Sequence, residues 1–260
     1  MDFGLKDKVA LVTGGSRGIG RAVSLTLARH GAHVAICGRT RETLDATAQE
    51  VRAEGVQCWT YPTDVGEDGA VEKLVADTGA NAGRLDILVN NAVSSTPARA
   101  DELTDDLFRY HIDVKLMAYI RAARAALPHM QNGRIVNIGG MTARITAPLR
   151  MTNGVVNAGV ANFTKQFASH AATRGTTVNC VHPGMTVTER VQQIFAKEAA
   201  EADTDAQTIA ARRTAEIPLG RLIQPQDMAD AVLFFCSPLA SMITGQCIAV
   251  DGGSGTSINY

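Results

Sequence analysis

Three glycines near the start of the chain have the spacing of a phosphate-binding turn. Gly14, Gly18 and Gly20 form a Gly-x-x-x-Gly-x-Gly pattern directly after an apolar run at residues 9–12. That run suits a strand buried on both faces, whereas residues 21–29 mix apolar and polar positions as a helix does. Glycines at such a turn bring backbone N–H groups and the positive helix end against a pyrophosphate. A helix start that merely needs flexible residues is less favoured, because strand, turn and helix occur in the required order.

The elements that follow continue the alternation of strand and helix. Strands are expected at residues 33–37, 56–61, 85–89, 134–138, 177–181 and 247–250, and helices at 40–52, 68–78, 104–130, 153–174 and 225–236. The short links predict an α/β fold, with one domain over residues 1–260 built on a doubly wound parallel sheet of Rossmann type with helices on both faces. Residues 185–216 are polar and Ala-rich, and we expect helical cover there, where a substrate lid would lie.

Composition and charge narrow the range of partners. The 260 residues can bury a full core, and 25 basic against 26 acidic side chains give no reason to expect nucleic acid or a membrane surface. Residues 1–8 carry mixed charge and no run approaches membrane-spanning length, so we expect a cytoplasmic protein. The five cysteines are odd in number and far apart, without a Cys-x-x-Cys, so neither a disulfide nor a metal site is predicted.

Taken in order, the motifs resemble the short-chain dehydrogenase/reductase family over almost the whole chain. The resemblance rests on the glycine turn at 13–20, Asp64-Val65, Asn90-Asn91-Ala92, the strand at 133–138, and the segments at 181–188, 218–221 and 244–253. Each of these motifs is weak alone, and their order and spacing together identify the fold.

The resemblance implies a nicotinamide dinucleotide across the carboxyl edge of the sheet and a small-molecule substrate. By analogy Asp64 and Val65 would meet the adenine, Asn90 the adenosine-side ribose, and the segment up to Thr188 the nicotinamide end. The implied cofactor-binding residues are Gly14, Ser16, Arg17, Gly18, Ile19, Gly20, Arg39, Asp64, Val65, Asn90, Ala92, Pro183, Gly184 and Thr188. Val93 stands where the family usually has glycine, and a β-branched residue cannot take a positive φ cheaply, so we expect that loop to be shaped differently.

Arg39 favours NADP(H) over NAD(H) as the cofactor. A carboxylate at the end of the second strand would bind both ribose hydroxyls and repel a 2′-phosphate, but the sequence there is Cys37-Gly38-Arg39. Arg39 can instead form bidentate contacts with a phosphate, and Arg17 in the glycine turn could join it. The alternative is that both arginines are solvated surface charges, which we favour less for Arg39 and leave open for Arg17.

By the register of the resemblance, none of the family's four catalytic positions carries its usual residue in this chain. Working members use a serine, a Tyr-x-x-x-Lys and an asparagine for acid/base and electrostatic roles, and the register carries these positions onto Gly140, Asn153, Asn157 and Lys115. Glycine has no hydroxyl and an amide does not titrate near neutral pH, so the family mechanism of ketone reduction is not expected. Lys115 could supply a cation or a proton, Thr142 a hydrogen bond, and the two asparagines neutral donors. A lysine on a long helix is, however, more often solvated or ion-paired.

Two classes of function remain open. The first is an NADP(H)-dependent oxidoreductase with non-standard catalytic residues, acting on a small carbonyl, alcohol or activated double bond. The second is an NADP(H)-binding protein without redox turnover, such as a sensor, scaffold or inactive partner. A non-redox lyase or isomerase in the same pocket ranks last, because the glycine turn is intact. Family analogy also implies a homotetramer or homodimer formed through the helices at 104–130 and 153–174.

Overall fold

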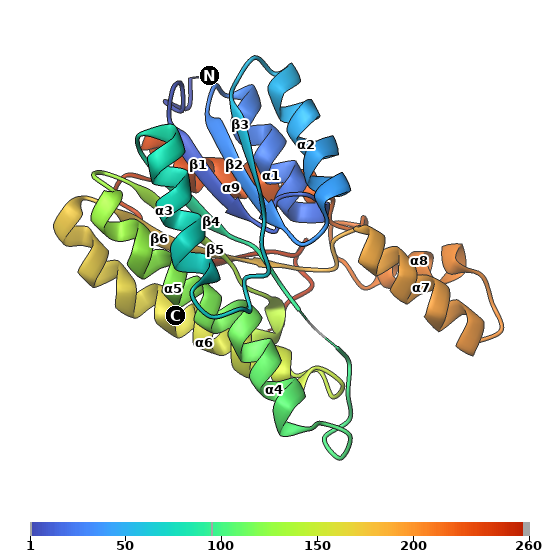
Figure 1. Cartoon of the computed structure of the whole chain (residues 1–260). Coiled ribbons are helices and arrows are strands. Elements are labelled where there is room, and N and C mark those ends of the chain that lie inside the picture. The colour runs from blue at the N-terminus through green and yellow to red at the C-terminus, as the bar shows by residue number, and fades with distance from the viewer. Residues whose placement is uncertain (1, 95, 257–260) are drawn as a thin grey trace.

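The computed structural model describes residues 2–94 and 96–256, which contain a seven-stranded parallel sheet (Figure 1). Its strands are β1 (Val9–Thr13), β2 (His33–Gly38), β3 (Cys58–Pro62), β4 (Ile87–Asn90), β5 (Arg134–Ile138), β6 (Thr177–Pro183) and β7 (Cys247–Val250). They lie in the order β3-β2-β1-β4-β5-β6-β7, so the winding reverses between β1 and β4. The predicted doubly wound α/β fold is confirmed, and the reversal opens a crevice at the carboxyl ends of these two strands.

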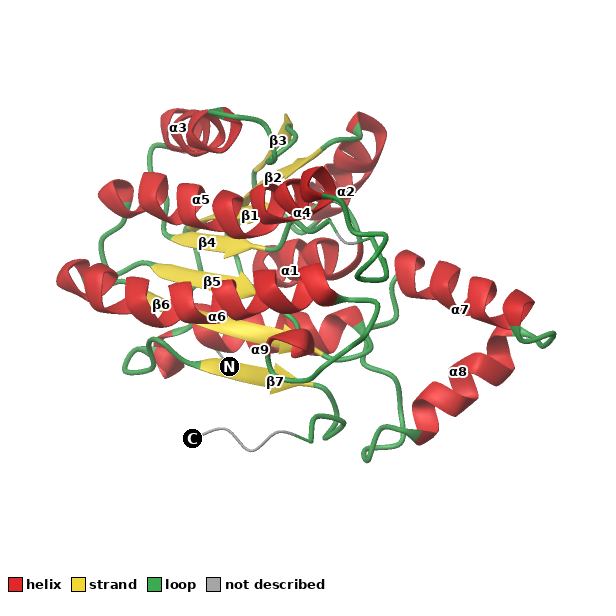
Figure 2. Cartoon of the chain, turned by 90° about the horizontal axis from the view of Figure 1, so that it is seen from below, coloured by secondary structure: helices red, strands yellow, loops and turns green. Residues whose placement is uncertain are grey.

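Helices cover both faces of this sheet (Figure 2). The α-helices of the described residues are α1 (Gly18–Arg29), α2 (Arg41–Ala53), α3 (Ala70–Ala82), α4 (Asp105–His111), α5 (Ala118–Ala126), α6 (Met151–Ala171), α7 (Glu189–Glu201), α8 (Ala206–Ala215) and α9 (Pro225–Cys236). Side chains of α1, α2 and α9 share one apolar core with the sheet, and those of α3, α5 and α6 share the other. None of the helices in the described part of the chain is both long and apolar enough to cross a bilayer.

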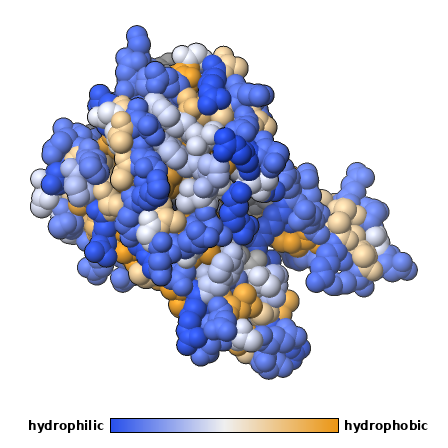
Figure 3. All heavy atoms as spheres, viewed as in Figure 1, coloured by the Kyte–Doolittle hydropathy of each residue, from blue (hydrophilic) through white to orange (hydrophobic). Residues whose placement is uncertain are grey.

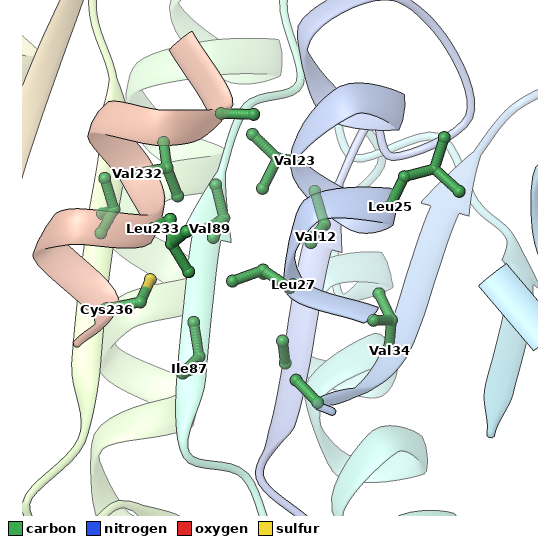
Figure 4. Close-up of a cluster of buried hydrophobic side chains, with 14 of the residues drawn as sticks. Val12, Val23, Leu25, Leu27, Val34, Ile87, Val89, Val232, Leu233 and Cys236 are labelled. Carbon is green, nitrogen blue, oxygen red and sulfur yellow. The ribbon is translucent and has the colours of Figure 1, made fainter. Parts of the chain in front are cut away.

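The first strand shows how the sequence builds these two cores. Ala10 and Val12 join the core under α1 and α9, while Val9 and Leu11 join the opposite core, because successive side chains of a strand point to opposite faces. All five residues of β1 are buried, as its apolar run predicts. Figure 4 shows valines and leucines of α1 and α9 meeting strands β1, β2 and β4 in the first of these cores.

The helix expected at residues 104–130 is interrupted. Helix α4 passes into a π-helical turn, η1 (Ile112–Met117), before α5 resumes the ordinary helical hydrogen bonds, and a 3₁₀ turn at Leu127–His129 follows. Other boundaries differ from expectation by a few residues, such as α6, which begins at Met151 rather than at 153. A π-helical turn inserts one extra residue into a helical turn and is found mostly at functional sites. This one contains Lys115.

Residues 185–216 form the expected helices. Helices α7 and α8 pack on each other through a small core of Phe195, Ala199 and Ile209, with Met185 against it. The pair projects from the body beyond the carboxyl ends of the strands (Figures 1 and 2). Orange spheres on this projection in Figure 3 show that it exposes hydrophobic side chains.

The turn between β1 and α1 is held by very close backbone approaches. Gly14 and Gly18 have positive φ values of 62° and 52°, in the left-handed region that favours glycine. The Asn91 side chain donates to the carbonyl oxygens of Thr13 and Gly14, both at 3.0 Å. A Cβ added to Gly20 would lie 2.1 Å from the Gly14 oxygen. The third glycine is therefore required by packing of the helix against the turn.

This close approach predicts opposite effects for two glycine-to-alanine changes within helices. Gly20→Ala should lower the free energy of unfolding by about 1–3 kcal/mol, because its methyl group collides with backbone that cannot move cheaply. Gly79→Ala in α3, where an added Cβ meets nothing within 4 Å, should raise it by about 0.5–1 kcal/mol through the lower entropy of the unfolded chain. Urea denaturation of both variants measures this. Equal stability of the two would show that the turn does not need its third glycine.

Candidate functional site

A cavity of about 700 Å³ lies at the carboxyl edge of the sheet, in front of the N-terminus of α1. All the positions that the family resemblance implies for the cofactor line it, except Gly20 and Asn90. Thirteen further residues complete the lining: Cys37, Gly38, Thr63, Asn91, Val93, Ser94, Tyr110, Val114, Thr186, Glu189, Arg190, Val191 and Gln193. Segments from five different strand ends and from α7 therefore meet at one crevice.

The glycine turn forms one wall of this cavity. Helix α1 has no acidic residue in its first turn and no side-chain cap, so its positive end faces the cavity without an acid of its own to neutralise it. A Cβ on Gly18 would lie 3.2 Å from the Thr188 methyl group, which shows how closely the turn approaches the start of α7. Backbone N–H groups at a helix N-terminus are suited to binding a phosphate.

Arg39 lies at the end of β2, where this cavity meets a second one of about 770 Å³ beside α3. Arg17 donates from Nη2 to the hydroxyl of Thr40 at 3.4 Å, so its guanidinium is directed to the segment that carries Arg39. Its Nη1 lies 4.0 Å from the exposed carboxylate of Glu189. Two guanidinium groups therefore lie around the end of β2.

Asn90 lies away from the cavity. Its fully buried side chain donates to the Oδ1 of Asn137 on the neighbouring strand at 2.9 Å. The next residue, Asn91, lines the cavity, and its backbone N–H donates to the Thr13 hydroxyl. Successive side chains of a strand point to opposite faces. The amide of Asn90 therefore lies within the sheet, whereas that of the next residue, Asn91, lies at the crevice.

Lys115 is buried and does not line the cavity, whereas its neighbour Val114 does. The side chain is 5 % exposed, and Nζ donates to the carbonyl oxygen of Gly139 at 2.8 Å. Burial lowers the pKa of this ammonium to about 8, because a low-dielectric surrounding disfavours the charged form. Lys115 thus titrates close to neutral pH beside the segment that follows β5.

The side-chain amide of Asn157 occupies the space where a side chain of residue 140 would lie. A Cβ on Gly140 would lie 2.4 Å from the Nδ2 of Asn157. That nitrogen donates to the Thr142 hydroxyl at 2.8 Å, and the buried Oδ1 of Asn157 has no hydrogen-bond partner among the described residues. Asn153 lies one helical turn earlier on α6 and is half-buried. Like Lys115, Thr142 and the two asparagines are not among the residues that line the cavity.

Two buried side chains hold this segment and were not predicted as site residues. The N–H of Gly140 donates to Nδ1 of His182 at 2.9 Å. The hydroxyl of Tyr119 lies 3.1 Å from the carbonyl oxygens of Ala92 and Ile138, at the ends of β4 and β5. The bonds that hold this segment go to backbone atoms, which a sequence pattern does not identify.

The structure also brings together cysteines that are far apart in the sequence. Cys180 and Cys247 are register partners on β6 and β7, and their sulfur atoms lie within 4.8 Å of each other and of a ring nitrogen of His182. A hydrogen bond from the Cys180 thiol lowers the pKa of Cys247 to about 5, with His182 adding to the effect. This cluster lies directly behind Gly139, where a Cβ would be 2.9 Å from the Cys180 sulfur.

Comparison with known proteins agrees with this architecture. Residues 14–255 match the family described as Enoyl-(Acyl carrier protein) reductase. The 3-oxoacyl-(acyl-carrier-protein) reductase FabG of Staphylococcus aureus is 32% identical over 250 residues, which cover 95% of this chain and 97% of that protein.

Solved structures are similar over nearly the full length. L-sorbose reductase from Gluconobacter frateurii, in complex with NADPH and L-sorbose, has a TM-score of 0.95 at 27% identity and covers 99% of this chain and 100% of that chain. A short chain dehydrogenase from Burkholderia cenocepacia, in complex with NADP, has a TM-score of 0.87 at 32% identity and covers 96% and 98%. The fold, the crevice and these similarities together establish that the chain belongs to the short-chain dehydrogenase/reductase family.

Proposed function

We propose that this protein is an NADP(H)-dependent oxidoreductase that acts on a small carbonyl compound, alcohol or activated double bond. The observation that carries the proposal is the single crevice that gathers the glycine turn, the N-terminus of α1 and Arg39. Oxidoreductases are found among the similar proteins, and two of the similar structures are complexes with NADPH or NADP. The whole of residues 1–260 would form one domain, with 185–216 as the substrate lid.

The residues of the crevice fit a dinucleotide phosphate. The glycine turn and the free positive end of α1 would hold the pyrophosphate, and Arg39 with Arg17 would hold the 2′-phosphate. Asp64 and Val65 would meet the adenine, and Pro183, Gly184 and Thr188 the nicotinamide end. When bound, the cofactor supplies or accepts the hydride.

The proton that accompanies hydride transfer requires a donor other than the family's tyrosine. Lys115 is a buried amine held beside Gly140 through its bond to the Gly139 carbonyl oxygen. Its ammonium would stabilise negative charge on the substrate oxygen and give up the proton as the carbonyl is reduced. The Thr142 hydroxyl, which accepts from Asn157, keeps its own hydrogen for donation to that oxygen. Asn153 and Asn157 would act as neutral donors.

One observation favours a second candidate, an NADP(H)-binding protein without redox turnover. Lys115 and Thr142 do not line the cavity, and the amide of Asn157 occupies the space where a Cβ at position 140 would lie. Saturable NADPH binding without hydride transfer across a broad panel of carbonyl compounds and alcohols would support this candidate over the first.

We further propose a homo-oligomer formed through α6. Leu149, just before this helix, and Met151 and Val155 in its first turns are each about half exposed, at 52, 47 and 50 %. Exposed apolar groups clustered on one helix end favour burial against a second copy. A mass in light scattering equal to that of one chain would contradict the proposal.

The phosphate assignment predicts a switch of cofactor preference in Arg39→Asp. The new carboxylate repels the 2′-phosphate and can bind ribose hydroxyls, so NADPH affinity should fall by about 10- to 100-fold while NADH affinity holds or rises. Fluorescence titration with each nucleotide measures this. The control Arg29→Asp carries the same change in charge at the far, exposed end of α1 and should alter neither affinity. Unchanged NADPH affinity in Arg39→Asp would refute the assignment.

The role of Lys115 predicts a pH profile. Since its pKa is lowered to about 8, the ammonium is present below this pH and is lost as the pH rises through it. Carbonyl reduction at saturating NADPH should therefore fall on the alkaline side, starting no lower than about pH 8, because a bound anionic cofactor can only raise the pKa of a nearby ammonium.

Lys115→Met is the variant that tests this role. It should reduce carbonyl substrates about 10²–10⁴-fold more slowly, with no alkaline fall, while NADPH still binds. Steady-state oxidation of NADPH across the pH range gives both readouts. A Lys115→Met protein that keeps the wild-type rate and the wild-type profile would remove Lys115 from the mechanism.

A further inference from the structure

Two cysteines that the proposed chemistry does not use meet between neighbouring strands. Cys180 on β6 and Cys247 on β7 are register partners, so their side chains leave the sheet on the same face. Their sulfur atoms lie within 4.8 Å of each other. Both are free thiols in this structure, so both sulfur atoms are available for reaction.

The backbone holds these two cysteines at a spacing that a disulfide can bridge. Neighbouring strands of a sheet lie about 4.8 Å apart, and the Cα atoms of disulfide-linked cysteines usually lie about 4.4–6.8 Å apart. Bond formation therefore requires the two sulfur atoms to approach one another through rotation about the Cα–Cβ bonds. The pairing of β6 with β7 can stay as it is.

The two thiols differ in exposure and in acidity. Cys180 is fully buried, whereas Cys247 is half-buried on the strand at the edge of the sheet. The hydrogen bond between them raises the pKa of Cys180 well above its ordinary value and lowers that of Cys247 to about 5. A thiolate at a partly exposed position therefore lies beside a protonated thiol. Redox-sensing cysteines share this arrangement, in which the second cysteine resolves the oxidised form of the first.

Basic groups from two further positions stabilise the thiolate of Cys247. After the bond from Cys180, His182 and the charge of Arg144 lower the pKa of Cys247 further. Arg144 follows β5, and its Nη2 donates to the Cys247 carbonyl oxygen at 2.8 Å. Cys247 otherwise packs against a cluster formed by Tyr119 and by apolar residues of η1 and α6.

A metal ion is the other ligand that two thiols and an imidazole could hold, and the bonding of His182 disfavours it. The Nδ1 of His182 accepts from the backbone N–H of Gly140 at 2.9 Å. A neutral imidazole that accepts at Nδ1 carries its hydrogen on Nε2, so neither nitrogen offers a lone pair to a metal. Two sulfur ligands alone do not make a zinc site. The thiol pair is thus better suited to redox chemistry.

We propose that Cys247 and Cys180 are a peroxide-reactive pair that forms a reversible disulfide between β6 and β7. The Cys247 thiolate attacks one oxygen of a hydroperoxide, the O–O bond breaks, and the leaving oxygen takes a proton from water and departs as an alcohol or water. The Cys180 sulfur then attacks the sulfenic acid, and the S–S bond forms while the sulfenic hydroxyl leaves as water with the Cys180 proton. Two electrons pass from the two sulfur atoms to the hydroperoxide. No nucleotide takes part, so the proposal is independent of the proposed function.

Peptide mapping of the full chain after treatment with hydrogen peroxide tests the proposal. The remaining thiols are blocked with iodoacetamide in denaturant, and the digest is analysed by mass spectrometry without reduction. The expected product is a peptide pair that links Cys180 to Cys247 within one chain, and dithiothreitol should separate it. Cys37, Cys58 and Cys236 should carry the blocking group, because burial raises their pKa values.

Single substitutions separate the two roles. In Cys180→Ala, oxidation should stop at a sulfenic acid on Cys247, which dimedone traps. In Cys247→Ala, Cys180 should remain a thiol, because it is buried and keeps its proton. The matched control Cys58→Ala removes another buried thiol, on β3, and should leave the yield of the Cys180–Cys247 link unchanged. The map of the wild-type chain tests the link even if a variant is unstable.

The rate of the first step should be nearly independent of pH above neutrality. Since the pKa of Cys247 is lowered to about 5, the thiolate is present above this pH and is lost as the pH falls through it. Loss of free thiol under excess peroxide should therefore be about equally fast at pH 7 and pH 9. A cysteine of ordinary pKa, about 8.5, would react roughly 20-fold faster at the higher pH.

Three results would overturn the proposal. In the first, both thiols still react with iodoacetamide after peroxide treatment. In the second, the link joins two chains or uses another cysteine. In the third, the purified wild-type chain holds one zinc ion that Cys247→Ala lacks, which would assign the cluster to a metal.

Discussion

The close contact between the β1–α1 turn and the helix that follows is the constraint on which the rest of the site depends. Only a glycine at position 20 lets α1 approach the carbonyl of Gly14, and Asn91 fastens the same turn to the end of β4. This contact fixes the positive end of α1 over the reversal in strand order. A looser turn would move the N-terminus of α1 away from the crevice. The backbone N–H groups at this helix end, which are suited to binding a phosphate, would move with it.

Residues 139–140, Asn157 and Lys115, which come from separate elements, fit one another in space. An asparagine at 157 requires that residue 140 have no side chain, because a Cβ there would collide with the amide. The bare backbone at 139–140 is in turn held by His182 and offers its carbonyl to Lys115. A π-helical turn places that lysine, and burial brings its pKa near neutrality. These contacts form one consistent local structure around residues 139–140.

The sequence predicted the parts of the molecule that depend on periodicity and on turn chemistry. The alternation of apolar runs with amphipathic segments predicted the sheet, and the glycine spacing predicted the turn that lines the crevice. Neighbours across the sheet were not predictable in this way. The interruption at Lys115, the inward side chain of Asn90 and the meeting of Cys180 with Cys247 depend on lateral packing, which strand and helix periods do not encode. Arg190, which lines the cavity, was missed because the segment around it has no periodic pattern.

The central claim is that the crevice binds NADP(H) as a working cofactor site, and direct calorimetric titration of the cofactor-free protein with NADPH and separately with NADH tests it first. The account predicts saturable binding with NADPH preferred by about tenfold or more, as expected for charge-assisted contacts to the 2′-phosphate. Failure of both nucleotides to bind, or tighter binding of NADH, would contradict it.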